Sequence, residues 1–149
     1  MIHHEDFIRS TYQLAISAQA KGNHPFGALL VLDNLVVATA ENTVFTEKDI
    51  TKHAELNLVS QVSREMDLES LSRSILYTST EPCAMCSGAI FWAGISHVVY
   101  GCSVALFGEI AGGTFVVPCR DLFKYGVKQI KVDGPVLEGE GAEIHRNFW

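Results

Sequence analysis

The stretches His53-Ala54-Glu55 and Pro82-Cys83-Ala84-Met85-Cys86 decide the fold and the chemistry that this sequence predicts. One imidazole and two thiols are ligands that zinc binds tetrahedrally, and a structural zinc site closes all four positions with protein ligands. These stretches supply only three such ligands, so one position would stay open for water, as in a catalytic site. The spacing therefore predicts a catalytic Zn²⁺ site with His53, Cys83 and Cys86 as ligands. Glu55 is a carboxylate that need not bind the metal.

Each stretch alone is a weak signal, because a Cys-x-x-Cys pair also occurs in redox motifs and structural zinc sites. The combination is specific, since His-x-Glu followed by Pro-Cys-x-x-Cys is the signature of zinc deaminases. On these residues the sequence resembles the cytidine deaminase-like superfamily, and within it the branch of guanine, cytosine and tRNA-adenosine deaminases. The resemblance covers most of the chain and is sharpest over residues 25–100.

Length and composition fit a single domain over residues 1–149. A chain of this length can bury about two thirds of its unfolded surface, and 48% hydrophobic with 19% charged residues is a globular composition. The formal charge of −6, with only 11 Lys and Arg, argues against a nucleic-acid partner, because phosphate binding needs clustered cations. We therefore expect a small, uncharged substrate.

The sequence also favours a cytoplasmic protein. Its four cysteines lack the regular spacing of a secreted disulfide framework, and its start does not resemble a secretory signal peptide. The longest apolar runs fall well short of the about 20 residues that span a bilayer. No membrane association is expected.

Hydrophobic periodicity predicts alternating helices and strands. Asp33-Asn34 suits a tight hairpin between the first two strands, and helical crossovers join the later strands in parallel. The expected fold is an α/β three-layer α/β/α sandwich around a five-stranded mixed sheet, as in cytidine deaminase-like proteins. The expected strands are residues 28–32, 35–40, 75–79, 98–100 and 129–132, and the expected helices are 4–21, one that begins after Thr51, 83–93, 120–125 and 136–149. The glycine-rich segment between residues 101 and 119 is expected to be a loop.

Both motifs are expected at helix starts, with Thr51 as the N-cap of one helix and Pro82 as the first residue of the other. Residues two apart point about 200° apart inside a helix, so His53 and Glu55 can converge only in a first turn. A helix N-terminus carries partial positive charge and free N–H groups, which favour cysteines as thiolates.

The motifs and the resemblance together imply a hydrolytic deaminase. Zinc lowers the pKa of a bound water to about 7, and Glu55 is the candidate for the proton transfers to the ring nitrogen and the leaving amine. The resemblance adds candidate substrate contacts: Asn42 for a polar edge of the substrate, Phe26 and Trp92 as pocket aromatics, and Ala54 between the two motif residues.

The substrate stays open. Trp92 and Pro25-Phe26-Gly27-Ala28 favour a guanine deaminase-like enzyme, but such enzymes tend to carry an acidic pair after the fourth strand, where this chain has only Glu109. Cytosine, cytidine, adenine, a pterin or a triazine remain alternatives. A non-catalytic zinc-binding module would need a fourth ligand, and Cys102 and Cys119 lack the spacing, so we expect them to be buried small hydrophobic residues.

The last two residues, Phe148 and Trp149, are expected to be buried, because large aromatics at a free terminus would otherwise form an exposed patch. Resembling deaminases are dimers or tetramers, so we expect a homodimer in which Glu143–Trp149 lies over an active site or along an interface. The alternative is that these aromatics only seal their own helix onto the core. Among the remaining histidines, His24 is the one expected near the pocket.

Overall fold

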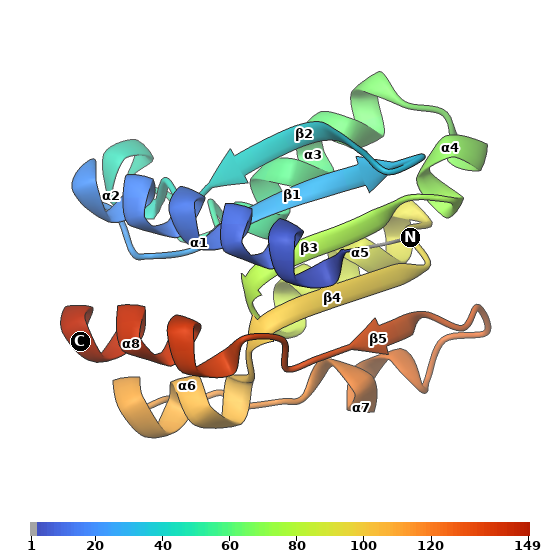
Figure 1. The fold of residues 1–149 in the computed structure, drawn as a ribbon. Helices are drawn as coiled ribbons and strands as arrows, with labels where there is room; N and C mark the ends of the chain where they lie inside the picture. The colour runs from blue at the N-terminus through green and yellow to red at the C-terminus, as the bar shows by residue number, and fades with distance from the viewer. Residues whose placement is uncertain (1–2) are drawn as a thin grey trace.

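The computed structural model describes residues 3–149 and places five strands in one sheet between two layers of helices (Figure 1). The strand order is β2-β1-β3-β4-β5. Strand β1 is antiparallel to both β2 and β3, whereas β3, β4 and β5 run parallel. The predicted α/β/α sandwich with a mixed sheet is confirmed. The strands are β1 (Gly27–Leu32), β2 (Leu35–Glu41), β3 (Ile75–Thr80), β4 (His97–Cys102) and β5 (Lys131–Asp133).

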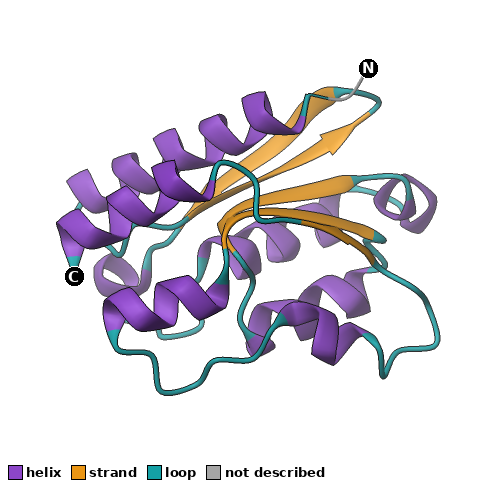
Figure 2. Ribbon diagram, turned by 60° about the horizontal axis from the view of Figure 1, so that its bottom comes forward, coloured by secondary structure: helices purple, strands orange, loops and turns teal. Residues whose placement is uncertain are grey.

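Helices cover both faces of the sheet (Figure 2). One layer contains α1 and α8, and the other contains α3, α5 and α7. No helix within residues 3–149 is both long enough and apolar enough to cross a membrane. The helices are α1 (His4–Ala20), α2 (Val44–Glu47), α3 (Ala54–Glu65), α4 (Leu68–Ser72), α5 (Ala84–Ala93), α6 (Val104–Ala111), α7 (Cys119–Phe123) and α8 (Glu138–Phe148).

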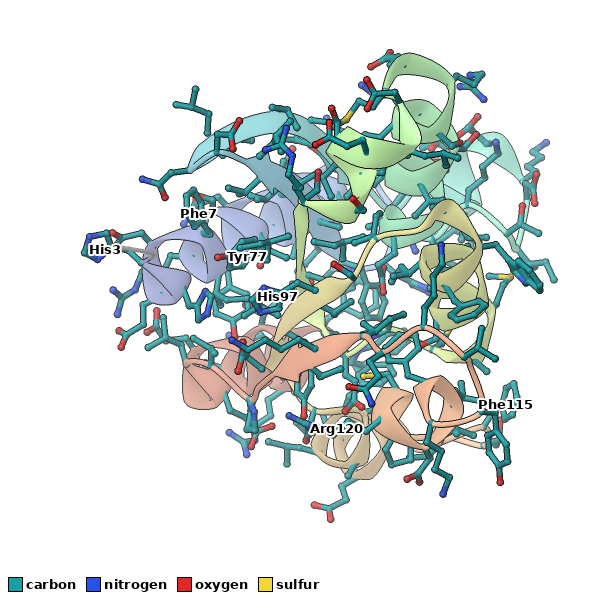
Figure 3. The ribbon with its side chains drawn as sticks, turned by 90° about the vertical axis from the view of Figure 1, so that its right-hand side faces the viewer. His3, Phe7, Tyr77, His97, Phe115 and Arg120 are labelled. Atoms are coloured by element: carbon teal, nitrogen blue, oxygen red, sulfur yellow. The ribbon has the colours of Figure 1, made fainter. Side chains whose placement is uncertain are left out.

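Helix α1 packs on the sheet through residues at helical spacing. The side chains of Ile8 and Tyr12 are buried against Tyr77 of β3, and Figure 3 shows this face with Phe7 and Tyr77 on neighbouring elements. The Tyr12 hydroxyl donates a hydrogen bond to the carbonyl oxygen of Leu137, 2.9 Å away. This bond ties α1 to the start of α8, which places the C-terminal helix beside it.

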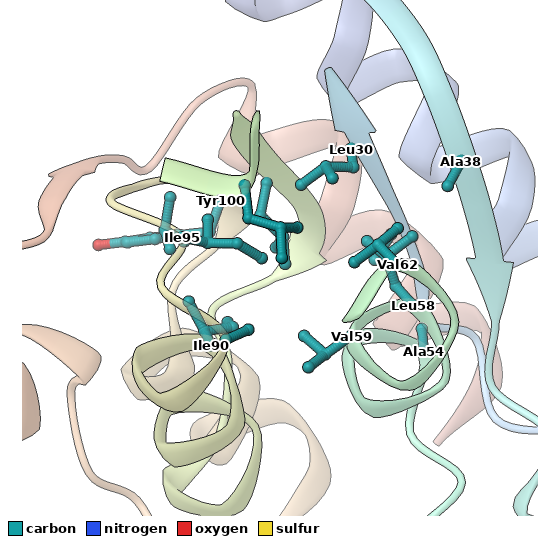
Figure 4. Close-up of a cluster of buried hydrophobic side chains, with 14 of the residues drawn as sticks. Leu30, Ala38, Ala54, Leu58, Val59, Val62, Ile90, Ile95 and Tyr100 are labelled. Atoms are coloured by element: carbon teal, nitrogen blue, oxygen red, sulfur yellow. The ribbon is translucent and has the colours of Figure 1, made fainter. Parts of the chain in front are cut away.

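Helix α3 is fixed to the opposite face by a buried stripe. Ala54, Leu58 and Val62 are spaced four apart, and all three are fully buried against Leu30 of β1 and neighbouring core side chains (Figure 4). Burying one leucine of this kind contributes about 1.5–3 kcal/mol relative to exposure. Because the stripe begins at the first residue of the helix, the core fixes the position of the first motif.

The helix starts differ from the sequence prediction. Helix α3 begins at Ala54 with His53 as its N-cap, so the prediction that Thr51 caps this helix is wrong. The Thr51 hydroxyl instead donates to Asp49 at 2.6 Å. Cys83 is the N-cap of α5, which places Pro82 before that helix rather than at its first position.

The prediction of a loop between residues 101 and 119 is also wrong in part, because residues 104–111 form α6. The Ser103 side chain caps this helix by accepting the backbone N–H of Leu106 at 3.2 Å. Gly112 ends the helix with a φ of 73°, the left-handed conformation that glycine adopts without strain. The short helices α2 and α4 were not predicted from the sequence.

Candidate active site

The three predicted metal ligands meet where α3 and α5 begin. The Nδ1 atom of His53 lies 3.6 Å from the Sγ atom of Cys83 and 3.6 Å from that of Cys86. Zinc–sulfur bonds of about 2.3 Å and zinc–nitrogen bonds of about 2.0 Å at a tetrahedral angle would separate S and N by about 3.5 Å. The donor set and its spacing therefore fit zinc. Among residues 3–149, no fourth His, Cys or acidic side chain joins this set.

The local electrostatics favour a thiolate at Cys83. Cys83 is an N-cap with extended backbone, and Cys86 lies in the first turn, so both are at the positive end of α5. Hydrogen bonds with Cys86 and His53 lower the pKa of Cys83, whereas donation to Cys83 and burial raise the pKa of Cys86. The hydrogen bond to Cys83 also raises the pKa of His53. Metal binding releases the protons that these groups share.

Glu55 lies beside the ligands and is only 5% exposed. Burial raises the pKa of this carboxyl group to about 7, and the charge on Cys83 adds to the rise. A carboxyl group with a pKa near the working pH can both accept and donate a proton. The first turn of α3 thus places His53 and Glu55 near one another, as the sequence required.

A cavity opens onto these residues. Its lining consists of Phe26, His53, Glu55, Thr80, Glu81, Cys83, Val104, Phe107 and Phe115. Three of the nine lining residues are phenylalanines, which provide apolar faces against which a flat ring can pack. None of the nine is Lys or Arg. The cavity therefore suits a flat and uncharged ligand.

The carboxylate of Glu81 connects one wall of the cavity to the start of α7. One of its oxygens accepts the backbone N–H of Val104 at 2.9 Å, and the other accepts that of Cys119 at 2.7 Å. Sequence reasoning missed Glu81, although a charged residue directly before Pro82-Cys83 was a usable signal. It also missed Phe107, because α6 was not predicted.

The residues predicted to contact the substrate differ in where they lie relative to the cavity. Phe26 lines the cavity. Ala54 is fully buried next to the lining residues His53 and Glu55. The side chain of Asn42 is buried, and its Oδ1 atom accepts the backbone N–H of Val44 at 3.0 Å, so part of its amide stabilises the start of α2.

Trp92 does not line the cavity of its own chain, which corrects the prediction. Its side chain is 83% exposed. Cys86 and Ile90 of the same helix are four residues apart and both buried. Trp92, two residues beyond Ile90, points about 200° away from that side of the helix. Glu109, the single acidic residue of the segment considered for purine contacts, is also exposed and lies outside the cavity lining.

The C-terminal helix reaches the cavity through His145, which is 2% exposed. Its ring packs against Phe26 and Phe107, with centroids 5.3 Å and 4.6 Å away. Its Nδ1 atom accepts the indole N–H of Trp149 at 3.1 Å, and its Nε2 atom lies 2.7 Å from the Thr80 hydroxyl oxygen. An indole nitrogen only donates, so Nδ1 carries no proton, and the neutral imidazole donates from Nε2 to Thr80.

The terminal aromatics lie outside the cavity lining, next to His24 and the lining residue Phe107. The prediction that both are buried is wrong for Trp149, which is 44% exposed, and Phe148 is partly buried. Their rings lie 4.8 Å and 5.7 Å from that of His24, and the Trp149 ring lies 5.9 Å from that of Phe107. His24 is thus near the pocket, as predicted.

Comparison with known proteins agrees with this site. The family model for the cytidine and deoxycytidylate deaminase zinc-binding region matches residues 1–102, which include both motifs. The solved structure of a guanine deaminase from Nitrosomonas europaea has the same fold, with a TM-score of 0.83 and 22% identity over 99% of this chain and 85% of that chain.

Three relatives illustrate the range of substrates in the family. A probable cytosine deaminase of Schizosaccharomyces pombe is 36% identical over 96% of this chain and 90% of its own length. A guanine deaminase of Bacillus subtilis is 39% identical over 66% and 64%. A tRNA-specific adenosine deaminase 2 of Xenopus laevis is 34% identical over 97% and 85%. The chain therefore belongs to the cytidine and deoxycytidylate deaminase family and is a zinc-dependent hydrolytic deaminase.

Proposed function

We propose that this enzyme removes the exocyclic amine of a free nucleobase, with guanine as the first candidate and cytosine as the second. The observation that carries the proposal is the position of Glu55, a buried carboxyl group beside three zinc ligands and on the wall of an aromatic cavity. The reaction consumes water and converts the C–NH₂ group of the ring into a carbonyl group and ammonia.

The chain's own residues have separate roles in this reaction. The chemistry that zinc supplies when bound by His53, Cys83 and Cys86 is a lowered pKa of a water molecule. Glu55 accepts one proton of this water and donates it to the ring nitrogen next to the reacting carbon. It then accepts the second proton from the hydroxyl group on that carbon as the C=O bond forms, and donates it to the amine as the C–N bond breaks. Phe26 and Phe107 hold the ring plane and exclude water from it.

Charge favours a base over a nucleotide or a tRNA. The cavity lining contains no Lys or Arg, and the chain as a whole has a formal charge of −6. A phosphate group would need cationic or N–H donors at the cavity mouth. The likeness to a tRNA-specific adenosine deaminase nevertheless makes tRNA the substrate that an assay must exclude.

Two observations keep cytosine as the second candidate. The similarity to the probable cytosine deaminase extends over 96% of this chain, whereas that to the Bacillus subtilis guanine deaminase covers 66%. Trp92, which favoured guanine in the sequence, lies outside the cavity of this chain, and so does Glu109, the single acidic residue where guanine deaminases tend to carry a pair. Guanine is favoured by the Pro25-Phe26-Gly27-Ala28 stretch and by the aromatic lining.

We also propose that the enzyme is a homodimer. Met85 and Trp92 are seven residues apart on α5, so they share one side of that helix, and both are exposed, as is Tyr125 beyond α7. Exposed apolar residues that gather in this way mark interaction surfaces. Sedimentation of the wild type and of Trp92→Glu tests the proposal: a wild-type monomer would refute it.

The substrate is tested by measuring ammonia release from guanine, cytosine, guanosine, cytidine and a tRNA with adenosine in its anticodon. We expect the highest kcat/KM for a free base, with guanine above cytosine. Phe107→Leu should raise KM, whereas Phe91→Leu, a change outside the cavity lining, should leave it unchanged. Faster turnover of tRNA or of a nucleoside than of any base would contradict the proposal.

A further inference from the structure

A second group of potential metal ligands consists of His4, His97 and Asp133. His4 begins α1, His97 begins β4 and Asp133 ends β5. The Nε2 atoms of His97 and His4 lie 2.7 Å and 3.6 Å from the same Oδ2 atom of Asp133. One ligand atom from each residue lies within 4.8 Å of the others. Figure 3 shows His97 next to Tyr77 on this face of the molecule.

This group is remote from the catalytic zinc ligands. Strands β3 and β4 run parallel, and His97 is at the beginning of β4. Cys83 follows the carboxyl end of β3, so the two groups lie at opposite ends of these parallel strands. All three side chains of the second group remain partly exposed, which gives a dissolved ion access to them.

We propose that His4, His97 and Asp133 form a second binding site, for a divalent transition metal. Two imidazoles and one carboxylate are a ligand set that suits Zn²⁺, Ni²⁺ and related ions. Metal–ligand bonds of about 2.0–2.2 Å place tetrahedral ligand atoms about 3.3–3.5 Å apart. The two separations of 2.7 Å and 3.6 Å lie on either side of this range, so small side-chain shifts would accommodate an ion.

A further hydrogen bond supports the proposal. The Nδ1 atom of His4 lies 2.7 Å from the hydroxyl oxygen of Tyr77, whose side chain is fully buried. Metal-binding histidines usually donate their other ring N–H to such a partner, which fixes the tautomer and the ring orientation. The Tyr77 hydroxyl oxygen can accept a hydrogen bond from the Nδ1–H group of His4, which leaves the Nε2 lone pair facing Asp133.

Lys131 competes with a metal ion for the carboxylate. Its Nζ atom lies 3.8 Å from Oδ2 of Asp133, and its side chain is 69% exposed. A long, exposed side chain of this kind can turn into solvent at little cost. The site should therefore bind more weakly than the cysteine site, and removal of the Lys131 charge should strengthen it.

The test adds Co²⁺ to the zinc-loaded enzyme and follows binding by calorimetry and absorption. Cobalt bound by thiolates gives an intense near-ultraviolet charge-transfer band, whereas cobalt bound by imidazole and carboxylate does not. The wild type should bind one equivalent without this band. His97→Gln and Asp133→Asn should lose this binding, Tyr77→Phe should weaken it about tenfold, and Lys131→Gln should strengthen it. Asp121→Asn is the matched control, because Asp121 is an exposed carboxylate that also lies near a lysine, and it should bind as the wild type does.

The same variants separate a metal site from a purely structural cluster of hydrogen bonds. Melting temperatures are measured with and without Co²⁺, and the metal should raise only those of proteins with an intact site. If His97→Gln and Asp133→Asn lower the melting temperature while cobalt has no effect on the wild type, the cluster is structural and the proposal is overturned. It is equally overturned if all bound cobalt shows the thiolate band.

Discussion

His145 predicts a specific loss of stability in acid. Its side chain is buried between Thr80 and Trp149, and both ring nitrogens are engaged. Protonation of Nδ1 would direct a new N–H at the indole N–H of Trp149, so two donors would face each other. Burial lowers the pKa of His145 to about 4 in the folded chain, against 6.5 as its ordinary value.

The size and sign of the effect follow from these two pKa values. Between pH 6.5 and about 4, the unfolded chain carries the proton on this histidine and the folded chain does not, so the free energy of unfolding falls as the pH falls. Each tenfold change in proton affinity is worth about 1.4 kcal/mol. The full loss is therefore about 3 kcal/mol, complete near pH 4 and absent above pH 7.

The assay is urea unfolding of the wild type and of His145→Gln at several pH values between 7 and 4. Gln cannot be protonated in this pH range. On acidification, the unfolding free energy of His145→Gln should therefore fall by about 3 kcal/mol less than that of the wild type. The comparison of slopes removes the contributions of zinc release and of other titrating groups, which both proteins share. His3→Gln, a change at an exposed histidine, should follow the wild type. If the unfolding free energies of the wild type and of His145→Gln fall in parallel with pH, the assignment of His145 as a buried and neutral histidine is refuted.

Three further outcomes are expected. Glu81→Ala leaves two buried backbone N–H groups unpaired and should cost about 2–6 kcal/mol in urea unfolding, with a smaller cost for Glu81→Gln. Gly101→Ala would place a Cβ atom 2.7 Å from the Ser79 carbonyl oxygen and should lower stability by about 1–3 kcal/mol. Metal analysis of Cys83→Ser should show no tightly bound zinc.

The sequence predicted the metal site well, because the chemistry of the ligands leaves few alternatives. The requirement that His53 and Glu55 share a first turn also followed from helix geometry. The caps were predicted wrongly, since Thr51 and Pro82 have the better local propensities for a helix start. His53 and Cys83 occupy the N-cap positions instead, which shows that placement of the ligands overrides local preference at a functional site.

The misplaced residues have physical explanations. The glycines around α6 suggested a loop, although Ser103 before an apolar run was a helix-start signal and Gly112 is its C-terminal stop. Helix α5 is apolar on nearly every side, so its sequence does not determine which side faces the core, and Trp92 was placed in the pocket. Trp149 is held by a hydrogen bond to His145 and by ring contacts with His24 and Phe107, and the two ring contacts come from residues far away in the sequence.

The most direct test of the central claim compares guanine deamination by the wild type and by Glu55→Gln at equal zinc content. Glu55 is assigned the proton transfers and not metal binding, so the variant should keep one zinc per chain at the site of His53, Cys83 and Cys86. Its kcat should fall by at least about 10²-fold, the usual contribution of a general acid and base. Turnover by Glu55→Gln close to that of the wild type, or loss of zinc together with activity, would contradict this account.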